Sequence, residues 1–565
     1  MNETSTDTTS QQPSSGWHRT IAFCLTCLFL VLWFGALDER EFVHPDEGRY
    51  AEIPREMVAS GDWITPRLNG FKYFEKPVLQ YWITAVSYLA LGEDEFQARL
   101  WPALSGFLTL LLGYLMGRRL AGVRAGVVAA AVLATSFQFF VSSQVLTLDM
   151  GLSFFLTLSL YGFLVSQDLR TTPRQQRGGS IVMWVAMALA VLSKGLVGVI
   201  LPALVLVSYI IIERDWKLLG RLHWGLEVLV FLVIALPWYV WVDLRNPEFF
   251  QFFFIREHFV RYALSEHHRA GAWYYFLAML LIGSLPWSFM YIRATFASWR
   301  IPSLQHFAIN PIRLLVLWVI VITFFYSVSQ SKLPGYILPV YPALALLLGC
   351  YAQRERKRLS QRMLLGIAAL GVAMMAAAPF VIRIPKFAAD ADLIGPFVAW
   401  AMAGGGILIA SAVLAMATMA RYPRFAVSAL GFGLLLSFQV LVTGSKSIED
   451  QFSAESLVDN ALDKMGAFEA GVPFYSFDMY DQTLAHHLQR TLIIVRFRGE
   501  LEMGIGRDPA KAVASVEEFR RLWQGHRQAY AIMPRAQFEE ERSAGTPFSI
   551  LTINRRAVVV ARAAL

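Results

Sequence analysis

The sequence predicts an α-helical protein that crosses a membrane about thirteen times and ends in a small α/β domain. Apolar runs of roughly twenty residues, each long enough to cross a bilayer as a helix, recur along most of the chain. The 565 residues are 56% hydrophobic and only 16% charged, which is unusual for a globular protein in water. From about Ile448 onward, charged residues become frequent and short β-like runs alternate with helical patterns.

The first forty residues are predicted to combine a tail with a membrane helix. Residues 1–16 are rich in Ser, Thr and Gln, so we expect a disordered cytoplasmic tail. No small-residue cleavage site follows the apolar run Ile21 to Leu37, which favours a retained helix over a signal peptide.

The rest of the membrane part is predicted from further apolar runs. Segment 78–92 is apolar but short and is interpreted as an interfacial or partly inserted helix. Twelve further spans are expected at 97–117, 123–141, 146–165, 181–192, 195–212, 225–242, 273–291, 313–328, 335–351, 363–382, 397–419 and 425–443.

Basic residues divide the connecting loops into two alternating sets. One set is rich in Lys and Arg and is therefore predicted to be cytoplasmic: Arg118, Arg119, Arg124, Arg170, Arg174, Arg177, Arg214, Lys217, Arg221, Arg293, Arg300, Arg313, Arg354, Arg356, Lys357, Arg358, Arg421 and Arg424. The other set faces outward and carries nearly every chemically suggestive residue. We expect a membrane domain at 17–445, with outer loops at 38–95 and 243–271, and an extracytoplasmic α/β domain at 446–565.

The C-terminal region shows strand patterns but no catalytic motif. Strands are predicted at 473–477, 492–497, 529–533, 549–554 and 557–561, with a helix at 516–524. The pair His486 and His487 is interpreted as part of the surface or core rather than as a ligand pair. The three cysteines, Cys24, Cys27 and Cys350, all lie inside apolar runs, so neither a disulfide framework nor a cysteine metal site is expected.

Two classes of partner are excluded by the pattern. The net charge is +8, but the basic residues sit in short loops between apolar runs, which sets topology and argues against nucleic-acid binding. The sequence has no Walker loop, dinucleotide fingerprint or evident Ser-His-Asp arrangement, so we expect no nucleotide. If the protein transfers a group, the activated donor must reside in the membrane.

The first outer loop gathers acids, cations and aromatic residues between His44 and Pro77. Asp46 and Glu47 are adjacent carboxylates, which suit a metal, a general base or a cation in a substrate. Arg49 can bind a phosphate in a bidentate way, although an Asp–Arg pair that merely fixes the loop is the alternative. Lys76 suits a phosphate as a point charge, and its neighbour Glu75 is a hard metal ligand.

Further candidates lie on the same predicted face. Asp149 begins an apolar helix, where it either caps that helix or contributes to a site. Lys194 lies between two apolar runs, where snorkelling towards water is the alternative to a functional role. His258, next to Glu257, is a possible metal ligand, although single histidines are usually structural. Tyr336, close to Lys332, suits a phosphate oxygen. This face fits an amphiphile with an anionic head and a polar group.

The run HPDEGRYAEIPREMVASGDWITPRLNGFKYFEKPVLQYW resembles the bacterial lipid A aminoarabinose transferases, and more loosely the protein O-mannosyltransferase group of polyprenyl-phosphate glycosyltransferases. Further matches are Thr147-Leu148-Asp149, Leu192-Ser193-Lys194-Gly195, Glu257-His258 with Arg261, and Lys332-Leu333-Pro334-Gly335-Tyr336. The resemblance covers about residues 20–345 and implies a GT-C glycosyltransferase in the bacterial inner membrane, with its active site facing the periplasm. The donor would be undecaprenyl phosphate carrying 4-amino-4-deoxy-L-arabinose, the acceptor a lipid A phosphate, and the outcome polymyxin resistance.

The resemblance also implies roles for individual residues. Asp46 would be the catalytic carboxylate and Asp149 a second acid of the cavity. The cations and phenol of the same face would hold the donor phosphate: Arg49, Lys76, Lys194, Arg261 and Tyr336. Glu75 and His258 would bind a divalent metal, Zn²⁺ or Mg²⁺. The alternatives are another polyprenyl-phosphate-sugar transferase, for example one with a protein acceptor, and a lipid-linked sugar flippase. Transporters tend to carry internal repeats and helices broken at mid-membrane depth, and the sequence indicates neither.

Overall fold

The computed structural model describes residues 15–260, 271–355, 360–384, 391–451, 453–554 and 556–562. Within these residues, nine helical segments are long and apolar enough to cross a membrane. They are α4 (Glu95–Ala121), α7 (Leu148–Ser166), α8 (Pro173–Lys194), α10 (Leu226–Arg245), α14 (Pro311–Val328), η3 (Pro334–Val340) continued by α15 (Tyr341–Arg354), α16 (Gln361–Val381), α18 (Ala391–Thr418) and α19 (Pro423–Gly444). The protein is therefore a multi-pass membrane protein, as predicted.

The other predicted spans are occupied by shorter or bent apolar helices. The shorter ones are α1 (Ser15–Phe34) and α9 (Val197–Glu213). The first bent pair is α5 (Val123–Ala134) with α6 (Phe137–Ser143), which turns by 69°, and the second is α12 (Tyr275–Gly283) with α13 (Ser288–Ser298), which turns by 112°. Thus each predicted range holds an apolar helix or a bent pair, while the number of true crossings stays a prediction.

The two bends contact each other and supply hydrogen bonds that each broken helix lacks. At the first bend, the Phe137 amide donates to the Leu285 carbonyl at the second, a distance of 3.1 Å. The Trp287 indole donates back to the Thr135 carbonyl at 3.1 Å. Backbone groups inside a membrane must find partners within the protein. The breaks are therefore compensated by tertiary contacts that no local sequence signal reveals.

The C-terminal domain holds a six-stranded sheet in the order β5-β4-β3-β6-β8-β7. The first four strands in this order are parallel to one another, and β8 runs antiparallel to them. The edge strand β7 is antiparallel to β8 and so has the direction of the first four. The elements are α20 (Glu455–Met465), β3 (Phe474–Phe477), α21 (Gln482–His487), β4 (Ile493–Val495), α22 (Glu502–Arg507), β5 (Ala512–Val513), α23 (Val516–Gly525), β6 (Tyr530–Pro534), α24 (Arg535–Ser543), β7 (Ser549–Ile553) and β8 (Ala557–Ala561). Every predicted strand is confirmed, and the two-residue β5 is additional.

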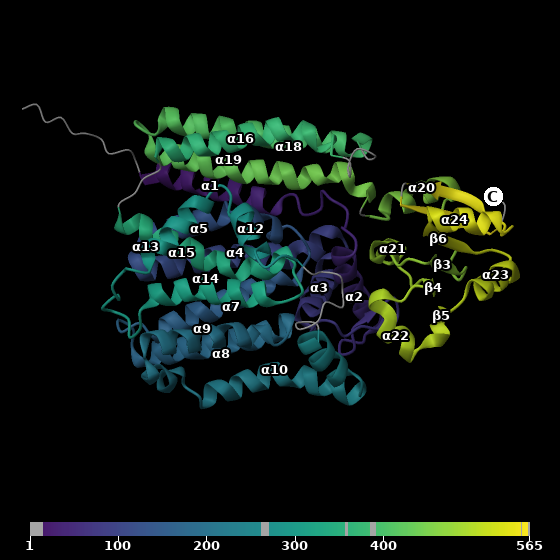
Figure 1. Ribbon diagram of the computed structural model, residues 1–565, viewed down its shortest axis with the longest axis horizontal. Helices are drawn as coiled ribbons and strands as arrows, with labels where there is room; N and C mark the ends of the chain where they lie inside the picture. The colour runs from purple at the N-terminus through teal and green to yellow at the C-terminus, as the bar shows by residue number, and fades with distance from the viewer. Residues whose placement is uncertain are drawn as a thin grey trace, which may run out of the picture.

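The first outer loop folds into a layer between the bundle and this domain. It contains α2 (Asp46–Ser60), the hairpin β1 (Arg67–Leu68) and β2 (Phe71–Lys72), and α3 (Leu79–Leu91). Figure 1 shows α2 and α3 at the end of the bundle that faces the C-terminal domain. On the exposed face of α3 lie Val86, Leu89 and Leu91, each more than half exposed, which fits the predicted interfacial helix.

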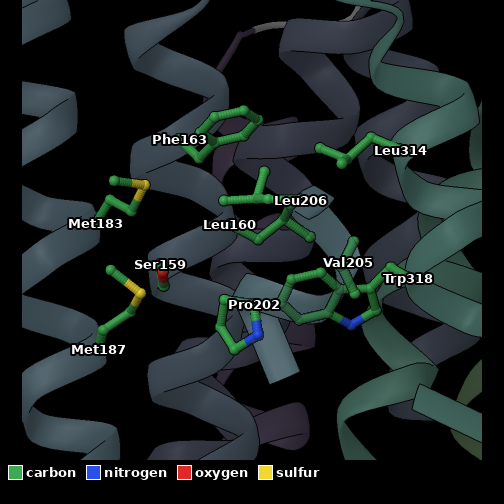
Figure 2. Close-up of a pocket in the computed structure, with 10 residues that line it drawn as sticks. All are labelled: Ser159, Leu160, Phe163, Met183, Met187, Pro202, Val205, Leu206, Leu314 and Trp318. Atoms are coloured by element: carbon green, nitrogen blue, oxygen red, sulfur yellow. The ribbon is translucent and has the colours of Figure 1, made fainter. Parts of the chain in front are cut away.

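Inside the bundle, an apolar crevice lies among α7, α8, α9 and α14 (Figure 2). The residues that line it are Ser159, Leu160, Phe163, Met183, Met187, Pro202, Val205, Leu206, Leu314 and Trp318. None of these ten side chains titrates in the physiological range. The crevice can therefore offer dispersion contacts but no acid–base chemistry, whereas the outer loops carry the ionisable side chains.

Candidate active site

The two adjacent carboxylates Asp46 and Glu47 face different surroundings, and Glu47 is a structural anchor. Glu47 and Arg99 are both fully buried and pair through two hydrogen bonds of 2.9 Å. Burial by itself would raise the pKa of Glu47, but the Arg99 guanidinium and the hydrogen bonds it donates lower that pKa to about 2. Glu47 also accepts from the backbone amides of Val43 at 3.0 Å and Leu146 at 2.8 Å. The anchor thus joins the first outer loop, α4 and the segment that precedes α7.

Arg99 completes this anchor through the backbone. Its Nη1 donates to the carbonyls of Leu37 at 2.7 Å and Arg40 at 2.6 Å, and its Nη2 donates to Glu41 at 2.8 Å. A guanidinium is suited to this task because its donors are fixed in one plane and remain charged. Nothing in the local sequence marks Arg99 as more important than other arginines, so sequence analysis missed it.

Asp46, by contrast, remains accessible at the first residue of α2. Its side chain is 42% exposed, and its Oδ1 accepts from Arg49 Nη1 at 3.2 Å. Successive helical residues point about 100° apart, so with Glu47 turned into the bundle, Asp46 is directed elsewhere. A carboxylate in the first turn is also favoured by the partial positive charge of the helix N-terminus. Asp46 is the member of the pair that is placed to meet a substrate.

Arg49 is buried and lies between two carboxylates. One is Asp46, and the other is Glu500 of the C-terminal domain, with which Arg49 Nη2 forms an ion pair. The guanidinium also lies over the ring of Tyr73, 5.9 Å from its centroid. Burial raises the pKa of Glu500, an effect that Arg49 opposes. Glu500 was not predicted, because it sits in the C-terminal domain with no motif around it and meets Arg49 only in the fold.

Lys76 connects the first outer loop to the other predicted loop. Its Nζ lies 4.0 Å from a carboxylate oxygen of Glu257 and donates to the Glu75 carbonyl at 3.0 Å. Glu257 belongs to η2 (Gln251–Val260), a π-helix, which is a rare element that is frequent at functional sites. The segment carrying Glu75 is therefore brought to the segment carrying His258. The side chain of His258, and Arg261 altogether, lie outside the described residues.

A second cluster brings together three predicted residues that are far apart in the sequence. Asp149, in the first turn of α7, forms an ion pair with Lys194 at the end of α8. Lys194 Nζ also lies 4.4 Å from the centroid of the Tyr336 ring. The Lys194 side chain is only 12% exposed, which excludes the snorkelling alternative. Thr147 is the N-cap of α7, and no side-chain hydrogen bond caps that helix end, so Asp149 serves the ion pair.

The absence of a side chain at Gly335 allows Asp149 to lie close to the segment that carries Tyr336. A Cβ at position 335 would lie 2.5 Å from Asp149 Oδ2, closer than Cβ atoms are found in real structures. The two clusters share one support, since Leu146, three residues before Asp149, is held by Glu47, the neighbour of Asp46. The acids Asp46 and Asp149 are therefore attached to the same outer edge of the bundle.

The C-terminal domain is docked directly on α2 and the hairpin. At Gly48 the backbones approach closely, because an added Cβ would lie 2.7 Å from the Thr483 amide nitrogen on α21. At the hairpin tip, the Asn69 side chain donates to the Leu492 carbonyl at 2.8 Å and accepts from the Leu492 amide at 2.6 Å. These contacts place Glu500 at the candidate site.

Both the membrane part and the C-terminal domain of this chain are similar to known glycosyltransferases. Residues 20–253 match the family model for dolichyl-phosphate-mannose-protein mannosyltransferases, and residues 464–562 match the aminoarabinose transferase C-terminal domain. Similar proteins from Edwardsiella ictaluri (34% identical over 342 residues) and Pseudomonas aeruginosa strain LESB58 (34% over 363 residues) are both described as undecaprenyl phosphate-alpha-4-amino-4-deoxy-L-arabinose arabinosyl transferases. These alignments cover 60% and 62% of this chain and span 60% and 64% of those relatives.

Solved structures extend the similarity to the whole chain. The crystal structure of ArnT from Cupriavidus metallidurans bound to undecaprenyl phosphate is 35% identical, with a TM-score of 0.90 over 98% of this chain and 99% of that one. Its apo structure gives a TM-score of 0.88 at 34% identity, over 97% and 98% of the two chains. Because one alignment covers the membrane bundle and the C-terminal sheet together at 35% identity, the chain belongs to the ArnT family of aminoarabinose transferases.

Proposed function

We propose that this protein is a membrane glycosyltransferase that moves 4-amino-4-deoxy-L-arabinose from undecaprenyl phosphate to a phosphate group of lipid A. The observation that carries the proposal is the full-length similarity to a protein of solved structure that binds undecaprenyl phosphate. The two clusters of acids and cations at one edge of the bundle support it. The product would reduce the negative charge of the membrane surface and so weaken the binding of polymyxin and other cationic peptides.

The cations of the site suit the leaving group of this reaction. An oxygen of the acceptor phosphate attacks the anomeric carbon, and the C–O bond to undecaprenyl phosphate breaks with inversion. Undecaprenyl phosphate leaves with the bonding electrons and gains a negative charge, which cations stabilise more in the transition state than in the ground state. We assign Lys76 to this charge, because it lies on the same outer loop as Asp46 and its Nζ is at 4.0 Å from a carboxylate oxygen of Glu257 on the other outer loop. Lys194, supported by Asp149 and Tyr336, adds a second charge.

Asp46 supplies negative charge where the reaction develops positive charge. A phosphate acceptor is already an anion, so no base is needed to remove a proton from it. The exposed Asp46 carboxylate then stabilises the positive charge that grows at the anomeric carbon. Arg49 holds this carboxylate in place, and it is itself balanced by Glu500. We therefore assign Arg49 chiefly to positioning Asp46, and Lys76 to the donor phosphate.

A divalent metal is part of the proposal, with Glu75 and His258 as its ligands. The ion pair between Lys76 and Glu257 draws together the two segments that carry these residues. A carboxylate and an imidazole are donors that suit Zn²⁺ better than Mg²⁺, which prefers oxygen ligands alone. When bound, the metal would supply a fixed positive charge beside the phosphate groups.

The orientation in the membrane completes the proposal. The cation-rich loops predict a cytoplasmic side, and α2, α3 and the C-terminal domain lie together at one end of the bundle (Figure 1). We assign that end to the periplasmic side of the bacterial inner membrane, where both lipid substrates would reach the site from the outer leaflet.

Mass spectrometry of lipid A tests the proposed function. Lipid A from polymyxin-challenged cells that lack the protein is expected to show no aminoarabinose mass increment, and wild-type protein is expected to restore it. If complemented cells still show unmodified lipid A although the lipid-linked sugar accumulates, the acceptor assignment is wrong. Loss of undecaprenyl-phosphate-sugar from the outer leaflet without transfer to any acceptor would instead indicate a flippase.

Replacing Gly335 by alanine is expected to slow transfer strongly. The added Cβ would displace Asp149 and so disturb its pair with Lys194, and misplacing an active-site group by about 1 Å can cost on the order of 10²-fold in rate. The transfer rate of purified protein, measured by the conversion of donor lipid, checks this. Gly366→Ala on α16 is the control, because its Cβ would meet nothing within 4 Å. Equal rates for the two variants would contradict the role given to the cluster.

A further inference from the structure

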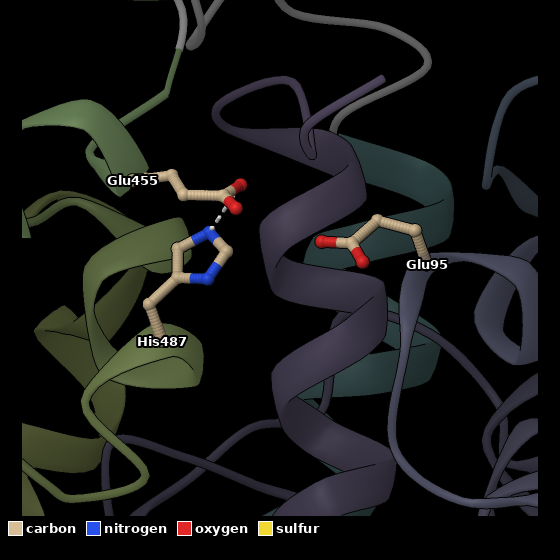
Figure 3. Close-up of side chains that lie close together, drawn as sticks. All are labelled: Glu95, Glu455 and His487. Atoms are coloured by element: carbon tan, nitrogen blue, oxygen red, sulfur yellow. Dashed lines mark ion pairs between the residues drawn. The ribbon is translucent and has the colours of Figure 1, made fainter. Parts of the chain in front are cut away.

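A second group of metal-ligating side chains lies where the C-terminal domain meets the bundle. It consists of Glu95 at the start of α4, Glu455 at the start of α20 and His487 at the end of α21. One ligand atom from each residue lies within 4.8 Å of the other two. Figure 3 shows the His487 ring and the two carboxylates, from three separate elements, directed towards one another. None of the three belongs to the candidate active site.

The three side chains carry the donor types of a transition-metal site. Glu95 and Glu455 supply carboxylate oxygens, and His487 supplies an imidazole nitrogen. The His487 side chain is only 12% exposed, so the group lies at the boundary between the domain and the bundle rather than on the open surface.

The imidazole of His487 turns its Nε2 atom towards Glu455. This nitrogen is enclosed, has no hydrogen-bond partner among the described residues and lies 3.5 Å from Glu455 Oε2. An imidazole nitrogen beside carboxylate oxygens matches the donor set of a transition-metal site. Nearby Asp481 and Asp459 add further negative potential at His487.

We propose that Glu95, Glu455 and His487 bind a divalent transition metal, with Zn²⁺ as the best fit, and that this ion fastens the α/β domain to the membrane bundle. Ligand atoms around tetrahedral Zn²⁺ at about 2.1 Å lie about 3.4 Å apart. The His487–Glu455 distance of 3.5 Å already matches this value. The widest separation, up to 4.8 Å, closes by about 1.4 Å through small rotations of the glutamate side chains.

The ligands favour a transition metal, and the elements that carry them indicate a structural role for the ion. An imidazole nitrogen disfavours Mg²⁺ and Ca²⁺, which prefer oxygen ligands. Three protein ligands leave one position for water, as in catalytic zinc sites. However, the three helices that meet here, α4, α20 and α21, join the bundle to the C-terminal domain and lie apart from the candidate active site. The ion would therefore act as a clasp that secures the domain carrying Glu500 against α2.

Metal analysis of the full-length protein in detergent tests this clasp. The protein is stripped with a chelator, equilibrated with Zn²⁺, freed of unbound ion and analysed for zinc per chain. His487→Ala and Glu455→Gln are each expected to lose one equivalent that wild type holds, with affinity reduced at least as far as the roughly 10–100-fold typical of losing an outer-sphere partner. The matched control His223→Ala changes an exposed histidine and should retain it. Glu75→Gln, which removes the other proposed metal, should leave this equivalent in place.

Thermal unfolding of the same samples separates metal binding from misfolding. Added Zn²⁺ should raise the Tm of stripped wild type and of His223→Ala, but not that of His487→Ala, whereas the stripped proteins should unfold at similar temperatures. Visible absorption after loading with Co²⁺ should show the tetrahedral bands of this site in wild type and in His223→Ala, and these bands should be lost in His487→Ala. Undiminished zinc content in both His487→Ala and Glu455→Gln, or an equal rise in Tm, would overturn the proposal.

Discussion

Asp46→Asn is expected to reduce the transfer rate by on the order of 10³-fold while the protein stays folded and binds its donor. Asparagine has nearly the same shape, and its amide oxygen can still accept from Arg49, so only the negative charge is lost. The carboxylate is 42% exposed, and a partly exposed ion pair contributes at most about 1 kcal/mol to stability. The effect should therefore appear in kcat, with little change in KM for the donor lipid.

Single-turnover transfer with purified protein measures this effect directly. Glu39→Gln is the matched control, because Glu39 is an exposed acid on the same outer loop, and its replacement should leave the rate unchanged. Unfolding temperatures of both variants should equal that of wild type. A rate for Asp46→Asn within tenfold of wild type would show that another group carries the role assigned here to Asp46.

The second large effect is expected for Arg99→Ala, and it concerns folding. This substitution leaves the Glu47 carboxylate buried without a counter-charge and removes the donor for the carbonyls of Leu37 and Arg40. Breaking a buried ion pair typically costs about 3–5 kcal/mol. We expect low yield from membranes, a markedly lower Tm in detergent and rapid proteolysis of the first loop. Arg118→Ala, an exposed cation on the same helix, should behave as wild type; similar Tm values for the two variants would contradict the anchor.

The same anchor predicts a dependence of stability on acid. Because the folded protein holds the pKa of Glu47 near 2, below its ordinary value of 4.5, the ionised carboxylate stabilises the fold fully above pH 4.5. That contribution is lost as the pH falls from 4.5 towards 2. Glu47→Gln should be less stable than wild type at pH 7, and the difference in Tm should shrink in acid. A difference that stays constant down to pH 3 would contradict this assignment.

The sequence predicted the membrane helices and the strands well, because each is specified by a local hydrophobic pattern. The bends at Thr135 and Leu285 were not predicted, since each is compensated by the other in three dimensions. β5 was missed because two residues, Ala512 and Val513, form too short a pattern to recognise. The local hydrophobic pattern thus predicts which residues are buried, but it does not predict which distant backbone group completes a hydrogen bond.

The candidate site shows the same division. Asp149, Lys194 and Tyr336 were predicted separately and lie in contact, so chemical character and predicted membrane side were enough to group them, while their roles stay predictions. The different tasks of Asp46 and Glu47 could not be told apart, because they depend on the rotation of α2 against Arg99. Nothing in the sequence around Glu500 indicated that it would pair with Arg49. The roles of all the candidate site residues stay predictions, including Glu75 and His258 as metal ligands and Arg261 as a phosphate ligand.

The pairing of Arg49 with Glu500 bears on how proteins of this architecture can diverge. Arg49, on the first outer loop of the N-terminal part, forms an ion pair with a residue that the C-terminal domain supplies. Gene fusion or recombination that exchanged the two parts independently would remove one of the two carboxylates between which this buried cation lies. The halves are therefore expected to be inherited together, and a chimaera should work only where the incoming half restores an acid at this point.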